Sequence, residues 1–266
     1  MRVVVVGASS GIGRAVGIGL AQGGDHVALL ARRGDRLDGA AAEAGNGAVP
    51  IVCDVTDEAA VVEAIARAAE ALGGIDGIVY ATAMGHMSPL KDVDAATWAA
   101  MFATNVTGAS LVTTAALPHL ERSQGVAIYL SSISASLTPP WPLIGAYATT
   151  KAALDKLVEA WRIEHPEIGF TRLTIGDCIG GEGHSMTELM SGAPPELLME
   201  AVTEWGGRKY ITGDFIDVEH LTQAIDSILR LGKSGVMPSA TVIARIKPGT
   251  ELPDPTEYSE SNLDAG

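Results

Sequence analysis

The chain has 266 residues, of which 47% are hydrophobic and 19% are charged, and its formal net charge is −14. This length is enough for one large α/β domain or two small ones, with a sizeable core in either case. The negative charge and the absence of a basic patch in the sequence argue against a nucleic-acid partner.

Segments typical of strands and of helices alternate along almost the whole chain. Short runs rich in β-branched residues predict strands at residues 3–6, 26–31, 49–53, 75–81, 126–130, 171–176 and 241–246. Helices are predicted at about 11–22, 36–43, 57–72, 97–122, 147–165 and 218–231, with 97–122 forming one long helix or two. This alternation predicts an α/β fold, a doubly wound parallel sheet (Rossmann-like) of about seven strands with helices on both faces.

The same pattern sets the expected domain organisation. We expect a single domain over residues 1–247, in which residues 182–207 form an insert that covers the substrate, and a flexible acidic tail over 248–266. Cys53 and Cys178 are too few for a disulfide framework, so buried thiols are expected. The first apolar run is too short for a signal peptide or a membrane span, so we expect a cytoplasmic protein with no membrane partner.

A glycine-rich turn joins the first predicted strand to the first predicted helix. Its glycines let the backbone turn tightly and approach a pyrophosphate, which would lie at the positive end of the helix. The spacing is G-x-x-x-G-x-G rather than the common dinucleotide fingerprint, and a plain strand-to-helix turn is the alternative. The predicted cofactor contacts in this turn are Gly7, Ser9, Ser10, Gly11, Ile12 and Gly13.

Two arginines, Arg32 and Arg33, follow the second predicted strand. Folds specific for NAD place an acidic side chain about 20 residues past the glycines, where it holds the ribose 2′-hydroxyl. The arginines in that region could instead pair with a 2′-phosphate, so we predict NADP rather than NAD as the cofactor. The alternative is that both arginines are solvated surface residues.

Tyr147 and Lys151 lie four residues apart in a predicted helix and therefore share one face, with the ammonium beside the phenol. An unperturbed tyrosine has a pKa of about 10. Because a fixed positive charge favours the phenolate, we expect the pKa of Tyr147 to be lowered toward the range of a general acid or base. The pattern Tyr-x-x-x-Lys alone also occurs on ordinary helix surfaces.

Further motifs occur in a fixed order along the chain. Asp54-Val55 follows the third predicted strand, Asn105 begins an N-x-x-G run in the long helix, and Ser131-Ser132 follows the fifth strand. Together with the glycine turn and the tyrosine–lysine pair, these motifs make the sequence resemble the short-chain dehydrogenase/reductase family. The resemblance covers nearly the whole chain, from residue 1 to about residue 246.

The resemblance implies a catalytic set of Ser132, Tyr147, Lys151 and Asn105 that acts on a carbonyl or a secondary alcohol. In this set Ser132 hydrogen-bonds the substrate oxygen, and Tyr147 passes a proton to it or takes one as hydride moves between the nicotinamide and the substrate carbon. Lys151 holds the nicotinamide ribose and lowers the pKa of Tyr147, and Asn105 supports a water relay. Tyr147 and Lys151 therefore count as cofactor-binding residues too.

The resemblance also implies further cofactor contacts and an assembly. Asp54 and Val55 would contact the adenine, and the backbone of Ala81 would contact the adenosine. In this family the helices at 97–122 and 147–165 commonly pair across a four-helix subunit interface, so a homodimer or homotetramer is expected. The six histidines show no metal-ligand spacing, so we expect no metal site and scattered structural roles for His26, His86, His119, His165, His184 and His220.

The chain departs from the family pattern at three places. The fourth strand usually ends N-N-A-G, but here it ends Tyr80-Ala81-Thr82-Ala83. The sixth strand usually runs into P-G, but here Gly176-Asp177 follows it, so the contact to the nicotinamide carboxamide is left unassigned. The loop after the fifth strand is long, and Ser134 is an alternative to Ser132, which we prefer because it follows the strand directly.

Other residues are weaker candidates for the substrate pocket. His86 and Met87 follow the fourth strand at the expected mouth of the site, with structural roles as the alternative. Trp141 and residues 184–190 could line the pocket, with surface packing as the alternative. The leading functional hypothesis is an NADP-dependent oxidoreductase; a non-catalytic, nucleotide-sensing regulatory or scaffold protein is the second, and an epimerase or dehydratase is a third.

Overall fold

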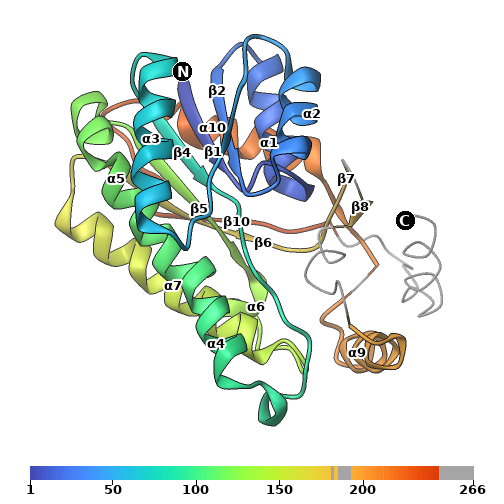
Figure 1. Ribbon diagram of the computed structural model, residues 1–266. Coiled ribbons are helices and arrows are strands. Elements are labelled where there is room, and N and C mark those ends of the chain that lie inside the picture. The colour runs from blue at the N-terminus through green and yellow to red at the C-terminus, as the bar shows by residue number, and fades with distance from the viewer. Residues whose placement is uncertain (181–182, 185–192, 212, 246–266) are drawn as a thin grey trace.

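The computed structural model describes residues 1–180, 183–184, 193–211 and 213–245, and Figure 1 shows their arrangement. Part of the expected insert (182 and 185–192), most of the predicted pocket segment 184–190 and the whole expected tail (248–266) lie outside these residues.

A sheet of seven parallel strands forms the centre of the molecule, in the order β10-β6-β5-β4-β1-β2-β3. The strands are β1 (Arg2–Val6), β2 (His26–Ala31), β3 (Val49–Val52), β4 (Gly77–Tyr80), β5 (Val126–Ser132), β6 (Gly169–Ile175) and β10 (Ser239–Val242). The strand order reverses direction between β1 and β4, which is the position where a doubly wound sheet opens a crevice at its carboxyl edge. The predicted fold is therefore confirmed.

Helices cover both faces of this sheet (Figure 1). One layer contains α1 (Gly11–Gln22), α2 (Gly34–Ala44) and α10 (Val218–Leu229). The other contains α3 (Glu58–Leu72), α5 (Gly108–Ser123) and α7 (Gly145–Glu164).

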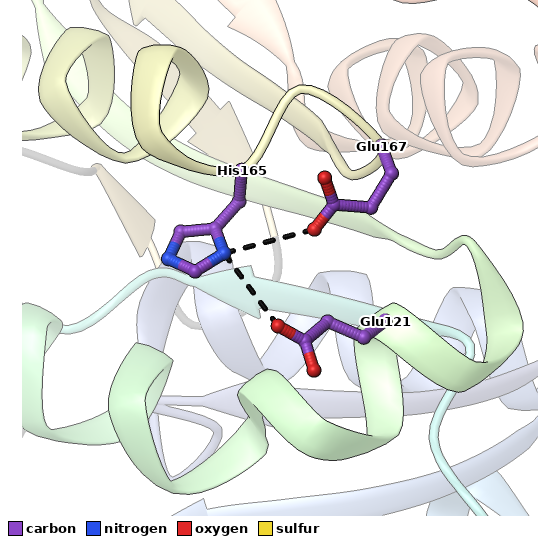
Figure 2. Close-up of side chains that lie close together, drawn as sticks. All are labelled: Glu121, His165 and Glu167. Atoms are coloured by element: carbon purple, nitrogen blue, oxygen red, sulfur yellow. Dashed lines mark ion pairs between the residues drawn. The ribbon is translucent and has the colours of Figure 1, made fainter.

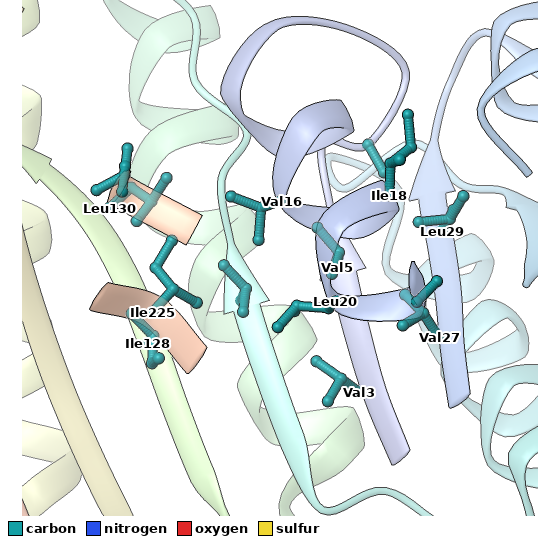
Figure 3. Packing of buried hydrophobic residues seen from close by; sticks show 14 of the residues in the cluster. Val3, Val5, Val16, Ile18, Leu20, Val27, Leu29, Ile128, Leu130 and Ile225 are labelled. Atoms are coloured by element: carbon teal, nitrogen blue, oxygen red, sulfur yellow. The ribbon is translucent and has the colours of Figure 1, made fainter. Parts of the chain in front are cut away.

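The two layers bury alternate residues of the same strands, because successive side chains of a strand point to opposite faces. Val3 and Val5 of β1 pack against α1, as Figure 3 shows, whereas Val4 and Val6 pack into the opposite layer. All four side chains are buried, and each contributes about 1.5–3 kcal/mol through removal from water. The β-branched run thus builds two cores at once and fixes the carboxyl end of β1 beside the glycine turn.

The predicted helix at 97–122 is one helical run with a change of winding inside it. It consists of α4 (Ala95–Phe102), a π-helical turn η2 (Ala103–Thr107) and α5. By length and by its mean hydropathy of 1.2, the run could cross a membrane. Its apolar side chains include Ala109, Val112, Ala116 and Leu120, which lie in the core on one face of the sheet.

Several short elements escaped the sequence analysis. They are η1 (Leu90–Asp92), α6 (Ile133–Ser136) and a small second sheet of β7 (Cys178–Gly180), β8 (Gly183–His184) and β9 (Ile216–Asp217). The expected insert contributes α9 (Pro195–Gly207), which lies apart from the main sheet in Figure 1. Trp205 of α9 packs against Trp141 with ring centroids 5.1 Å apart, and this contact begins a small separate core.

Candidate active site

A cavity of about 620 Å³ opens at the carboxyl edge of the sheet, and we call it the central cavity. It lies where the loops after β1, β2, β3, β4, β5 and β6 converge, as expected for a doubly wound sheet. Of the predicted site residues, its lining contains Gly7, Ser9, Ser10, Gly11, Ile12, Gly13, Arg32, Arg33, Asp54, Val55, Ala81, Ser132, Tyr147 and Lys151. Segments far apart in the sequence are therefore brought to one place.

The glycine turn forms a cradle that leaves no room for a side chain at Gly7 or at Gly13. Gly7 has φ +92, and a Cβ there would lie 2.6 Å from the backbone nitrogen of Thr82. A Cβ on Gly13 would lie 2.3 Å from the carbonyl oxygen of Gly7. The first turn of α1 has no acidic residue, so the positive end of the helix dipole faces the cavity without a competing carboxylate. The turn therefore suits a phosphate group.

A cationic corner lies beside this cradle. Arg33 donates to the hydroxyl of Ser9 through Nε at 3.2 Å and Nη2 at 3.1 Å, and to the hydroxyl of Ser10 at 2.5 Å. Arg32 lies near Asp54 and helps to lower the pKa of that carboxyl, after the hydrogen bond from the backbone of Thr56. Two guanidinium groups and two hydroxyl groups at one corner can bind a second phosphate.

Tyr147 and Lys151 stand one turn apart on α7, and both line the cavity. The Lys151 side chain is buried, and its Nζ donates to the carbonyl oxygen of Leu130 at 2.8 Å. The same nitrogen lies 5.8 Å from the centroid of the Tyr147 ring. Burial lowers the pKa of Lys151 to about 8, and the charge of Asp155 opposes that fall.

The expected lowering of the Tyr147 pKa is wrong for this structure. The surrounding protein removes most of the water from the phenol, and this loss of solvation raises its pKa above the ordinary value of 10.0. Hydrogen bonding with Ser132 opposes the rise, but Lys151 makes no comparable contribution because its ammonium is bonded to Leu130. The spacing in the sequence predicted that the ammonium lies beside the phenol and lowers its pKa. In the structure the lysine ammonium binds the Leu130 carbonyl, and burial of the phenol raises the pKa of Tyr147.

Both candidate serines line the cavity. Ser132 ends β5 and caps α6, since its Oγ accepts from the backbone nitrogen of Ser134 at 3.2 Å. The hydroxyl oxygens of the two serines lie 2.9 Å apart. The Ser132 hydroxyl lies close enough to Tyr147 to oppose the rise of its pKa, whereas Ser134 is almost fully buried.

Asn105 is fully buried in the π-helical turn and does not line the cavity, although the adjacent Thr104 does. Its Oδ1 accepts from the backbone nitrogen of Met84 at 2.7 Å. Its Nδ2 donates to the Met84 carbonyl and to Oγ1 of Thr150, both at 2.8 Å. Asn105 thus joins the loop after β4 to the helix that carries Tyr147 and Lys151.

Tyr80 stands at the end of β4, where the family pattern has an asparagine. Its hydroxyl donates to the carbonyl oxygen of Thr104 at 2.6 Å. A Cβ on Gly108 would lie 2.9 Å from this hydroxyl, so the glycine of the N-x-x-G run leaves room for the phenol. The substitution therefore keeps a polar contact between β4 and the π-helical turn.

The sequence analysis missed part of the cavity lining. The loop after β4 contributes Thr82, Ala83, Met84 and Gly85 to the lining. The sequence analysis noted only that the segment Tyr80-Ala81-Thr82-Ala83 departs from the family's N-N-A-G pattern. Asp177, which stands in the altered P-G segment, lines it as well, and burial raises the pKa of its carboxyl to about 6.

The weaker pocket candidates divide. His86 and Trp141 line the central cavity. Met87 does not, and instead packs in the small core with Trp205.

Comparisons with known proteins agree with this arrangement. The sequence profile of the short chain dehydrogenase family matches residues 1–175. The chain belongs to this family. A short chain dehydrogenase of Pseudocercospora fijiensis is 37% identical over 168 residues, which are 60% of this chain and 53% of that relative. The inactive 2-(S)-hydroxypropyl-CoM dehydrogenase 2 of Xanthobacter autotrophicus is 34% identical over 203 residues, which are 76% of this chain and 85% of that relative.

Solved structures of related proteins share the fold of this chain. An alcohol dehydrogenase from Thermococcus sibiricus, complexed with 5-hydroxy-NADP, superposes with a TM-score of 0.76 at 25% identity. This structural match covers 92% of this chain and 97% of the Thermococcus chain. The sequence match to the Pseudocercospora relative, in contrast, spans only about half of that relative's length. The similarity shows an oxidoreductase family with a Rossmann-like fold and supports the binding of NAD(P).

Outside the central cavity, one histidine lies between two glutamates. His165 follows α7, and its Nδ1 lies 3.6 Å from Oε1 of Glu121 and 3.6 Å from Oε1 of Glu167 (Figure 2). The three groups could hold a metal ion, but both carboxylates are exposed. Side-chain contacts of His165 with two exposed carboxylates explain the same geometry, so the cluster supports no metal assignment.

Proposed function

We propose that this short-chain dehydrogenase is an NADP(H)-dependent oxidoreductase that interconverts a carbonyl and a secondary alcohol on a small-molecule substrate. One observation carries the proposal. Ser132, Tyr147 and Lys151 line the same cavity as the glycine cradle and the arginine corner. A proton donor and a dinucleotide site within one cavity are what hydride transfer to a carbonyl requires.

The residues of the cavity fit NADP. Gly7 and Gly13 leave the backbone of the cradle open, and the N-terminus of α1 lies in the same turn. A pyrophosphate needs both features. Arg32 and Arg33, with Ser9, would hold the 2′-phosphate. Asp54 and Val55 would contact the adenine, and the backbone of Ala81 the adenosine. When bound, the nicotinamide supplies or accepts the hydride.

The chain's own residues would bind the substrate oxygen and move its proton. The Ser132 hydroxyl would hold that oxygen, and the Tyr147 hydroxyl would donate its proton to it during reduction; in the oxidation direction the Tyr147 phenolate would take the proton back. The raised pKa keeps Tyr147 protonated, which is the form that donates. Lys151 would hold the nicotinamide ribose, and Asn105 would support a water relay to solvent.

Ser132 is the better serine for this role. Its hydroxyl lies close enough to Tyr147 to influence the pKa of the phenol, and Ser134 lies almost fully buried with its backbone nitrogen bonded to Ser132. A serine beside the phenol would hold the substrate oxygen within reach of the transferred proton.

The first prediction concerns Tyr147. Tyr147→Phe should reduce turnover by at least about 10²-fold, the typical contribution of a positioned general acid, because the ring keeps its packing but loses its proton. NADPH binding, measured by fluorescence titration, should change little. A broad panel of ketones and alcohols supplies the substrate for the turnover assay.

The matched control is Tyr129→Phe, because Tyr129 is a fully buried tyrosine whose hydroxyl bonds only to Thr113, outside the cavity lining. Undiminished turnover in Tyr147→Phe would refute the assigned role. A panel without any turnover by the wild type, together with tight NADPH binding, would favour the second candidate, a non-catalytic NADP-sensing protein. The inactive relative from Xanthobacter is the observation that keeps this candidate in view.

We also propose that the chain acts in the cytoplasm as a homodimer or homotetramer, with α5 and α7 at the subunit interface. The support is the family resemblance and the partly buried Leu111, Leu117 and Leu157, which lie on these two helices. Light scattering on the purified protein measures the assembly directly.

A further inference from the structure

A buried carboxylate lies behind the lysine of the catalytic set. Asp155 follows Lys151 by four residues on α7, so the two side chains share one face of the helix. Side chains on a helix lean toward its N-terminus, which directs the carboxylate of Asp155 toward Lys151. Asp155 is only 5% exposed and does not line the central cavity.

Three polar groups from neighbouring elements surround this carboxylate. Arg172 of β6 places Nη1 3.5 Å from Oδ2, and Ser136 of α6 donates to the same oxygen at 3.4 Å. Within the described residues, Oδ1 has no hydrogen-bond partner of good geometry. Ser131 of β5 lies close enough to lower the pKa of Asp155, although its hydroxyl likewise lacks a well-aligned partner in the described part of the chain.

We propose that Asp155 is a positioning residue for the reaction: anchored by Arg172 and Ser136, its carboxylate, one helical turn after Lys151, keeps that ammonium charged and bonded to the Leu130 carbonyl at the cavity. The inference rests on the proposed function, since it assigns Asp155 a role that acts through Lys151. A buried carboxylate is costly unless cations compensate it. Arg172 is one such cation, and Lys151 is the second, on the same helix face as Asp155.

The charges of Lys151 and Asp155 each influence the pKa of the other group. Removal from water lowers the pKa of Lys151 to about 8, and the charge of Asp155 is the influence that opposes this fall. Burial raises the pKa of Asp155, while Arg172 and Lys151 both act to lower it. The groups around the pair are Tyr147 on α7, Arg172 on β6, Ser131 and the Leu130 carbonyl on β5, Ser136 on α6, and the neutral Asn105 and Thr150.

The consequence is a specific loss when the carboxylate is neutralised. Without it, Lys151 should release its proton at a pH lower by about one unit, because a nearby opposite charge shifts a pKa by about that amount. Near pH 8 the charged fraction of Lys151 would then fall severalfold. A lysine without charge would neither hold its bond to Leu130 as firmly nor carry an ammonium to the nicotinamide ribose.

The test measures the titration of Lys151 directly. In protein labelled with ¹³C-lysine, the Cε shift of Lys151 is followed against pH and is assigned by its loss in Lys151→Met. Asp155→Asn, which keeps the shape and removes the charge, should lower the midpoint by about one pH unit. Glu159→Gln is the matched control, since Glu159 lies one turn further on α7, is partly exposed and pairs with Lys156.

The outcomes are distinct. A midpoint that falls in Asp155→Asn and not in Glu159→Gln supports the proposal; an unchanged midpoint, or equal shifts in both variants, overturns it. Asp155→Ser, a smaller neutral substitution, repeats the measurement if the asparagine variant does not fold.

Turnover supplies a second and separate readout. The alkaline fall of kcat should move to lower pH by the same amount in Asp155→Asn, with the KM for the carbonyl substrate unchanged. A merely structural role would lower kcat equally at every pH. Because the NMR midpoint does not depend on turnover, it still reports on Asp155 if Tyr147→Phe proves fully active and the proposed function fails.

Discussion

At the scale of single residues, cofactor choice depends on the arginine corner. Arg33 is held by the hydroxyls of Ser9 and Ser10, which orients one guanidinium toward the cradle before any ligand arrives. Pre-orientation of this kind reduces the entropy lost on binding. The proposed preference for NADP rests on this corner, where a 2′-phosphate would meet donors that are already oriented.

Replacing Arg32 and Arg33 together with alanine should weaken NADPH binding by at least about tenfold, since each charge-assisted bond contributes about 1.5–3 kcal/mol. NADH binding should change much less, because NADH has no 2′-phosphate. Fluorescence titration with both nucleotides measures the two affinities. Arg36→Ala, which removes an exposed arginine of α2 outside the cavity lining, is the control; equal losses for NADPH and NADH would remove the basis for NADP preference.

The residue scale also separates what the sequence could predict from what it could not. Residue identity and spacing located the members of the cradle and the tyrosine–lysine pair, because both depend on chemistry within a few residues. The pKa of Tyr147 was predicted in the wrong direction, because it depends on how much water the folded chain removes and on the Leu130 carbonyl that binds Lys151. Neither is encoded locally.

At the scale of elements, the π-helical turn η2 determines where Asn105 stands. A π-helical turn is rare and places one extra residue in a helical turn, which suits a site that must present a side chain out of the regular spacing. Tyr80 holds this turn from β4 through the Thr104 carbonyl. Tyr80 stands where the family pattern has an asparagine, and in this chain its hydroxyl makes the contact with the turn.

Tyr80→Phe should therefore lower the free energy of unfolding by about 1–2 kcal/mol, because it leaves a buried carbonyl without its donor. It should also lower turnover, since the turn that positions Asn105 would loosen. Tyr129→Phe is again the control: it removes a buried hydroxyl that bonds to Thr113 on the same layer. Urea unfolding and turnover separate the two effects; equal turnover in both variants would contradict a role for Tyr80 beyond stability.

The regular elements were predictable and the irregular ones were not. Long β-branched runs and apolar residues at helical spacing gave all seven strands of the main sheet and six of its covering helices, with boundary errors of a few residues. The strands β7, β8 and β9 have two or three residues each, too few for any periodicity to develop. The turn η2 has the local sequence of an ordinary helix, and its winding follows from contacts with β4 and α7.

At the scale of the whole molecule, the main sheet and the small core around Trp205 have different roles. The sheet fixes the cradle and the catalytic helix, whereas the small core places α9 against Trp141, which lines the cavity. Trp205 is fully buried, and its Nε1 donates to the Pro142 carbonyl at 2.9 Å. We infer that this core shapes the substrate end of the cavity and contributes little to the dinucleotide end.

Trp205→Phe should accordingly raise the KM for substrate severalfold, because it removes the bond to Pro142 and part of the packing against Trp141. The affinity for NADPH should be unchanged. Steady-state kinetics and fluorescence titration test the two statements. Loss of both affinities together would show that α9 supports the whole cavity rather than one end of it.

The position of β1 between β2 and β4 has a consequence for synthesis on the ribosome. The apolar run of β1 emerges first, and β2 can pair with one edge soon afterwards. The other edge of β1 pairs with β4, which ends at Tyr80. At ordinary translation rates of about 5–20 residues per second, β4 is complete roughly 4–15 s after β1. During that interval the nascent chain exposes an unpaired valine-rich edge that is prone to aggregation, so we expect its yield to depend on chaperone capacity.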